Sequence, residues 1–170
     1  MIYGLTNIGV IHTAISLVAV AAGFVALIRD GKIDVRITLG KVYWITTVLT
    51  CLTGFFIFQH GGFGKPHALG IITLLTLGVA WVAGYTQLLG KLSPYVEVVS
   101  YSLTFFFHWI PGVTETTTRL PLGNPIFASP EAPELQAIAG LLFLVFLIGA
   151  TLQVLSLRKH LPYSPKGRLT

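Results

Sequence analysis

Four histidines lie where folding alone does not require them, and their side chains are the first candidates for chemistry. His60 and His67 flank a glycine-rich turn, QHGGFGKPH, between two long apolar segments, and His12 and His108 lie within two others. A turn is built by glycine and proline rather than by histidine. Because neutral imidazole is a common protein ligand for Zn, Cu and Fe, these side chains predict a metal or haem site if the fold brings them together.

Two kinds of cofactor suit this set of residues. A transition-metal ion needs three or four donors that converge from separate segments. The candidate metal ligands are His12, His60, His67, His108 and Glu115, the last as an oxygen ligand or as a hydrogen-bond partner of a ligating ring. A b-type haem needs two axial histidines at similar depth, and His12 with His108 is the candidate pair. The alternative is that a hydrogen bond between helices satisfies each ring.

Polar residues also recur with helical spacing in the fourth apolar segment. Successive spacings of four, three, four and seven residues place one set on a single helix face: Glu97, Tyr101, Thr104, His108 and Glu115. Ionisable groups are costly against lipid, so this face should turn toward the interior of a bundle. We expect Glu97 to pair with Lys91 or to reach water, and Glu115 to pair with Arg119. A proton-coupled carrier that uses Glu97 and His108 is an alternative function.

The composition is that of a membrane protein. Of 170 residues, 54% are hydrophobic and 10% are charged, whereas soluble domains carry roughly 25% charged residues. The mean hydropathy is +0.79. Five segments approach or exceed the length of about 20 residues that crosses a bilayer: 5–28, 38–59, 67–90, 95–118 and 134–157. We therefore predict an all-α integral membrane protein with five transmembrane helices, in one domain over 1–160 with a basic tail at 161–170.

Loop lengths and charge distribution predict the topology. Short connections make the first four helices antiparallel neighbours, so we expect a four-helix bundle with the fifth helix packed on it. When the connections are assigned alternately to two sides, nine of the eleven basic residues fall on one side: Arg29, Lys32, Arg36, Lys41, Lys91, Arg158, Lys159, Lys166 and Arg168. This bias predicts an inner-membrane protein with a periplasmic N-terminus and a cytoplasmic C-terminus. The basic groups should face anionic lipid headgroups, not nucleic acid.

Two stretches of the chain resemble a bacterial family of uncharacterised predicted membrane proteins with several helices. These stretches are GFVALIRDGKI and VRITLGKVYWITTVLTCLTGF. Two later stretches, SYSLTFFFHW and TTTRLP, loosely resemble the family's later segments, so the resemblance covers roughly residues 8–122. The family pattern is a His-Arg pair followed by glycine and tyrosine. Arg36, Gly40 and Tyr43 match it, while Val35 replaces the histidine. The resemblance implies a small membrane protein of unassigned activity. The general form is also similar to cytochrome b-like helical bundles, without their histidine spacing.

Three functions stay open on the sequence alone. The first is an outward-facing histidine site for a transition metal (Cu, Zn or Fe) or haem b, acting in electron transfer or metal handling. The second is a cofactor-free accessory subunit packed against other membrane protein subunits, and the third is a small proton-coupled transporter. A hydrolase is not expected, because no nucleophile is placed with a base and an orienting acid. Cys51 is expected to be an apolar filler in mid-helix.

Overall fold

The computed structural model describes residues 6–58, 62–86 and 88–160. Within these residues the chain forms five α-helices and no strand, which confirms the predicted all-α class. The helices are α1 (Asn7–Asp30), α2 (Thr38–Gly54), α3 (Lys65–Thr86), α4 (Ser93–Arg119) and α5 (Pro133–His160), with a 3-10 turn, Gly90–Leu92, before α4. His60 and the basic tail 161–170 lie outside the described residues.

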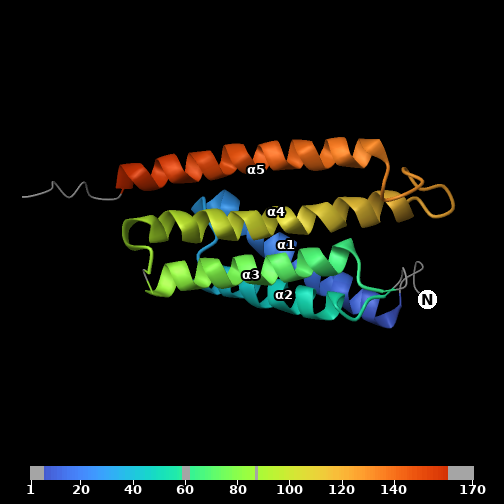
Figure 1. The fold of residues 1–170 in the computed structure, drawn as a ribbon, viewed down its shortest axis with the longest axis horizontal. Helices are drawn as coiled ribbons and strands as arrows, with labels where there is room; N and C mark the ends of the chain where they lie inside the picture. Colours follow the sequence, from blue (N-terminus) through green and yellow to red (C-terminus); the bar gives the residue numbers. More distant parts are fainter. Residues whose placement is uncertain (1–5, 59–61, 87, 161–170) are drawn as a thin grey trace, which may run out of the picture.

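The first four helices form an antiparallel bundle, and α5 lies along its outside (Figure 1). α1 packs against α2 and α4, α3 packs against α2 and α4, and α5 packs against α4. This arrangement follows from the short connections, which leave each of the first four helices beside its sequence neighbour. The helix on the outside, α5, has an 18-residue apolar window in which no residue is buried.

Three of the helices, α1, α3 and α5, are long and apolar enough to cross a membrane. α2 has 17 residues, at the lower end of the range for a span. α4 has 27 residues and carries an ionisable stripe on one face. Both helices have one face that is at least partly exposed, but their buried polar side chains, such as Thr47 of α2 and Thr104 of α4, point to other helices of the bundle.

Two helices end four or five residues before their predicted boundaries, whereas every other helix end lies within three residues of its predicted position. α2 stops at Gly54, five residues before the predicted boundary at 59. The Thr53 hydroxyl donates to the carbonyls of Leu49 and Thr50, a back-bond that bends and weakens a helix end. The next residues tighten into i→i+3 bonds, from the Phe56 N–H to the Thr53 carbonyl and onward.

α3 stops at Thr86, four residues before the predicted boundary at 90. Gly90 then adopts a φ of 55°, a left-handed value that suits glycine, in the turn toward α4. Pro94 lies in the first turn of α4, where its missing N–H costs no helical hydrogen bond.

Small residues allow α1 to approach the bundle closely. Ala19, Ala22 and Ala26 are buried, and a Cβ added at Gly23 would lie 2.6 Å from the Phe105 ring. The same Cβ would lie 2.9 Å from the ring of Tyr43, so this position admits glycine alone without a shift. Not every small residue acts in this way. Gly78 of α3 is exposed, and no described atom lies within 4 Å of a Cβ added there.

The centre of the bundle is unusually polar. The largest fully buried side chains are Tyr43, Tyr101, Ile33, Leu77, Thr47, Thr104 and Ser93. Five of these seven carry a hydroxyl group, whereas the outward faces of the helices carry many exposed leucine, isoleucine, valine and phenylalanine side chains. This inside-out distribution suits a protein whose exterior meets lipid, where polar groups must be satisfied internally.

Candidate functional site

The site is a line of polar side chains between α2 and α4, here called the polar column. Its α4 members, Glu97, Tyr101, Thr104 and His108, are 9%, 0%, 0% and 9% exposed. Their partners come from the start and middle of α2 and from the α1–α2 loop: Arg36, Tyr43 and Thr47. The inward turn of the α4 stripe was predicted from spacing and is confirmed for these four residues.

The middle of the polar column is a connected set of hydroxyl groups. The Tyr43 hydroxyl lies 2.7 Å from the Thr104 hydroxyl and also hydrogen-bonds to that of Thr47. The Thr104 hydroxyl donates to the Tyr101 carbonyl over 2.8 Å. The Thr47 hydroxyl lies 3.1 Å from Nε2 of His108.

These contacts determine the direction of every hydrogen bond in the set. The Thr104 hydroxyl has given its proton to a carbonyl, so its oxygen accepts from Tyr43. Tyr43 has then used its only proton, so its oxygen accepts from Thr47, and Thr47 in turn accepts from His108. The His108 tautomer with the proton on Nε2 therefore completes a chain of four hydrogen bonds, all running the same way.

At the opposite end of the polar column, Arg36 and Glu97 form an ion pair. The end of the bundle that carries Arg36, Lys41 and Lys91 is here called the basic end. Nη1 of Arg36 lies 2.6 Å from Oε1 of Glu97, and Nη2 lies 3.3 Å from Oε2. Nη2 also donates to the carbonyl of Gly84 over 2.8 Å. The guanidinium carbon lies 5.4 Å above the ring of Tyr85. A forked, charge-assisted pair of this kind fixes both distance and orientation.

Asp34 extends this ion pair into the α1–α2 loop. Its carboxylate lies 3.2 Å from both Arg36 and Lys32, and it accepts the backbone N–H of Arg36. The hydrogen bond to Glu97 is the main cause that raises the pKa of Arg36 above its ordinary value. Burial acts to raise the pKa of Asp34, but the hydrogen bonds from Arg36 and Lys32 outweigh it and lower the pKa below its ordinary value.

Two glycines make room for this end of the site. A Cβ at Gly84 would overlap the Glu97 carboxylate, so α3 can pass α4 at this point only without a side chain. A Cβ at Gly40 would overlap the Asp34 carbonyl oxygen, so the loop can fold back on the first turn of α2. Tyr101, one turn along α4 from Glu97, has a buried hydroxyl with no hydrogen-bond partner among the described residues.

The ion pair was not foreseen from the sequence. Glu97 was expected to pair with Lys91 or to reach water, but it pairs with Arg36, which lies 61 residues away. The expectation favoured a cation near in sequence, whereas the fold brings the α1–α2 loop across the start of α4. The other acidic residue of the stripe, Glu115, does pair with Arg119 as expected. The Glu115 side chain is 53% exposed and does not join the polar column.

The predicted histidine cluster is only partly assembled. Nδ1 of His12 lies 3.0 Å from the Thr53 hydroxyl, while His108 bonds to Thr47. These two threonines are six residues apart on α2, or about 9 Å along the helix axis. His12 and His108 therefore attach to the same helix at different levels.

His67 is buried apart from both, at the start of α3. Its ring stacks at 5.0 Å on Phe58 and lies 5.4 Å from Phe63, and its Nδ1 accepts the Gly64 N–H over 3.2 Å. Among the residues that the structure describes, no three histidine, cysteine or acidic side chains form a group that could hold a metal ion. The predicted metal site thus finds no support in this part of the chain, and its fourth histidine, His60, lies outside it.

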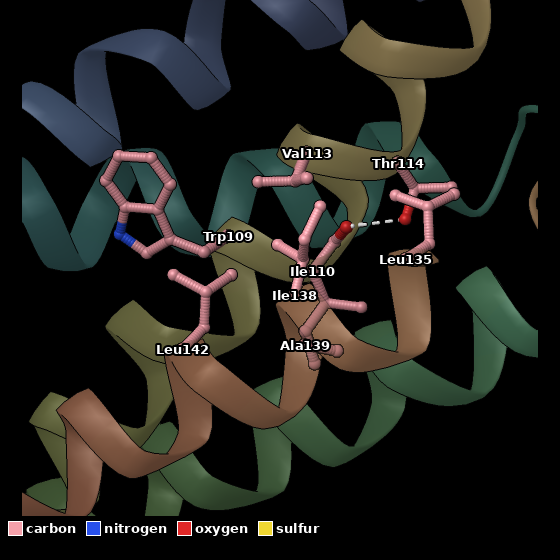
Figure 2. A pocket seen from close by; sticks show the side chains of 8 residues that line it. All are labelled: Trp109, Ile110, Val113, Thr114, Leu135, Ile138, Ala139 and Leu142. Carbon is pink, nitrogen blue, oxygen red and sulfur yellow. Dashed lines mark hydrogen bonds between the residues drawn. The ribbon is translucent and has the colours of Figure 1, made fainter. Parts of the chain in front are cut away.

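The space between α4 and α5 offers no alternative site. The side chains labelled in Figure 2, from Trp109 of α4 to Leu142 of α5, enclose about 20 Å³, which is close to the volume that one water occupies. Thr114 is the polar side chain in this set, and its hydroxyl donates to the Ile110 carbonyl of its own helix (Figure 2). The chemistry of the molecule therefore centres on the polar column.

Comparisons with protein-family models, with curated proteins and with solved structures gave no match to this chain. The function is therefore inferred from the site itself. The three residues behind the family resemblance all have a structural role here. Arg36 holds Glu97, Gly40 lets the loop close on α2, and Tyr43 is the central hydroxyl of the polar column.

Proposed function

We propose that the protein is a small integral membrane protein of five spanning helices that carries protons through its bundle, as a proton-coupled transporter does. One observation carries the proposal. Buried ionisable and hydroxyl groups follow one another along α4 from Glu97 to His108, and Glu97, Thr104 and His108 bond to α2 or to the loop before it. Ionisable residues inside membrane bundles are costly to keep, and they commonly mark ion pathways and proton relays.

The hydrogen-bond chain gives the relay a direction. A proton that arrives at Nδ1 of His108 lets Nε2 release its own proton to Thr47, which passes its proton to Tyr43. Thr47 and Tyr43 each gain one proton as they give up another, so no charge stays on them. For a net transfer, Thr104 must release its own proton to water that enters the bundle, because the Tyr101 carbonyl to which it donates cannot pass a proton on. The hydrogen bonds of the described residues do not continue from Thr104 to Glu97, since the buried Tyr101 hydroxyl has no partner among them.

Adjacent threonines on α2 provide a matched test of this proposal. Thr47 belongs to the polar column, whereas the hydrogen bonds of Thr46 to described residues all go to carbonyls of its own helix. Protein in liposomes with an internal pH-sensitive dye is driven by a potassium diffusion potential. We expect Thr47→Val to lower proton flux by at least about tenfold, since a relay cannot bypass a missing hydroxyl, and Thr46→Val to leave it within about twofold. Equal flux through both variants, at equal amounts of folded protein, would refute the proposal.

A second candidate is a histidine-held cofactor, a transition-metal ion or a b-type haem, used in electron transfer or metal handling. The Thr53 hydroxyl gives its proton to Leu49, so it accepts from Nδ1 of His12 and leaves Nε2 of that ring unprotonated. His108 likewise keeps Nδ1 outside its bond to Thr47. A Soret band in the purified protein, or stoichiometric Cu, Zn or Fe, supports this candidate. If both measurements are blank, it is excluded.

A further inference from the structure

A groove opens between α2 and α3 at the basic end of the bundle. It holds about 240 Å³ and is lined by Val35, Lys41, Trp44, Ile45, Trp81 and Tyr85. Trp81 and Tyr85, which both line it, stack on each other with ring centroids 5.1 Å apart. This groove is separate from the polar column, although Tyr85 also carries the guanidinium of Arg36 on its ring.

The groove is polar at its mouth and apolar further in. Lys41 lies in the first turn of α2, and Tyr85 is next to the last residue of α3, so both mark the same end. Trp44, Ile45 and Trp81 lie about one turn deeper on the two antiparallel helices. A cation and a phenol above an indole-lined apolar slot match the order of headgroup and acyl chain at a membrane interface.

Of the basic residues near the groove, Lys41 has no acidic partner among the described residues. Lys32 and Arg36 are paired with Asp34 and Glu97, at distances from 2.6 to 3.2 Å. Lys41 is exposed and makes no ion pair with any described residue. Lys41 lines the groove and is exposed, so its ammonium group is available to attract an anion there.

We propose that this groove binds one anionic phospholipid, with its phosphate at Lys41 and an acyl chain against Trp44, Ile45 and Trp81. The proposal is independent of proton transport, because none of these residues belongs to the polar column. The predicted topology agrees with it, since the basic end faces the leaflet that is rich in anionic lipid.

Tryptophan quenching by brominated lipid tests the binding directly. The chain has three tryptophans, and Trp109 lies on α4 away from the groove. In the full-length Trp109→Phe variant, fluorescence therefore reports on Trp44 and Trp81. Brominated phosphatidylglycerol should quench this signal at about fivefold lower mole fraction than brominated phosphatidylcholine, the factor expected for one cation at an anionic headgroup.

A second lysine at the same end supplies the control. Lys91 is exposed in the turn before α4 and does not line the groove. Lys41→Gln should abolish the preference for the anionic lipid and Lys41→Glu should reverse it, whereas Lys91→Gln should keep it. Equal quenching by the two lipids in the Trp109→Phe protein would overturn the proposal. So would an equal loss of preference in Lys41→Gln and Lys91→Gln, because the attraction would then come from general surface charge.

Discussion

The hydrogen-bond partners of His12, His67 and His108 determine which ring nitrogen carries the proton, and they give each ring a different set of contacts. His12 donates from Nδ1 to a threonine whose own proton is already used. His67 accepts at Nδ1 from the Gly64 N–H, so its neutral form carries the proton on Nε2, which is buried without a partner in the described part of the chain. His108 donates from Nε2 into the polar column. One residue type thus serves three local purposes, and only His108 joins a hydrogen-bonded path.

Gly84 should be more sensitive to a methyl group than any other glycine of α3. We expect Gly84→Ala to lower the free energy of unfolding by about 1–3 kcal/mol, because the new Cβ overlaps the Glu97 carboxylate and displaces it from Arg36. Gly78→Ala lies in the same helix with open space around it, and should be neutral or stabilising by up to about 1 kcal/mol. Unfolding of both variants in detergent by denaturant or heat measures the difference. Equal effects would contradict the close approach at Gly84.

The Asp34 carboxylate should make the fold sensitive to acid. Its pKa in the folded protein is below the ordinary value, so its contribution to stability is present above the ordinary pKa of about 4 and is lost as pH falls through the lower folded value. We expect thermal stability to decrease as pH is lowered below about 4, and Asp34→Asn to reduce that dependence. A melting series between neutral and acid pH, run on both proteins, measures this. An unchanged slope in Asp34→Asn would show that other carboxylates cause the loss.

At the scale of whole helices, residue spacing within one segment predicted which side chains share a helix face. It did not predict which distant residues these side chains contact. The α4 stripe was predictable because a 3.6-residue period fixes which side chains share a face. Its partner Arg36 was not, because nothing local indicates that a loop 61 residues away crosses the start of α4. The end of α2 was also missed. Apolar residues continue beyond Gly54, but the backbone changes there to i→i+3 hydrogen bonds, so the helix ends before the apolar run does.

One glutamine fastens α5 to the bundle. The Ser102 hydroxyl donates to the Gln153 side-chain oxygen over 2.8 Å, and the Gln153 amide donates to the Gly31 carbonyl over 2.8 Å. We expect Gln153→Leu to lower the free energy of unfolding by about 0.5–2 kcal/mol, the range for hydrogen bonds between membrane helices. Gln136→Leu changes an exposed side chain of the same helix and should have little effect. Hydrogen exchange along α5 distinguishes loosening of this helix from global destabilisation, and equal protection in both variants would exclude the fastening role.

At the scale of the molecule, the fold places hydroxyl and charged groups inside and apolar groups outside. α1, α3 and α5 present long apolar surfaces, whereas α2 and α4 contribute the polar column between them. Such a distribution would be unstable in water, since a large apolar exterior has no cover there. In a bilayer it is the favourable arrangement, because lipid covers the exterior and the helices satisfy one another's polar groups.

Charge distribution predicts how this molecule is oriented. If all five helices span, the α4–α5 loop and the basic end are expected on opposite sides of the membrane, and the excess of basic residues predicts that the basic end is cytoplasmic. Cys51, the one cysteine of the chain, is buried, so Cys51→Ala gives a background for single-cysteine variants. In that background, Asn124→Cys in the exposed α4–α5 loop should react with a membrane-impermeant maleimide on intact cells. Lys91→Cys should react only after the cells are opened.

The reverse pattern of labelling would invert the orientation. Labelling of both positions from outside would show that α4 does not cross the membrane, because α4 is the one helix between residues 91 and 124. In that case α4, the more polar helix, is the one to reassign. The polar column would then open to one side only, and proton passage across the membrane would require a different route.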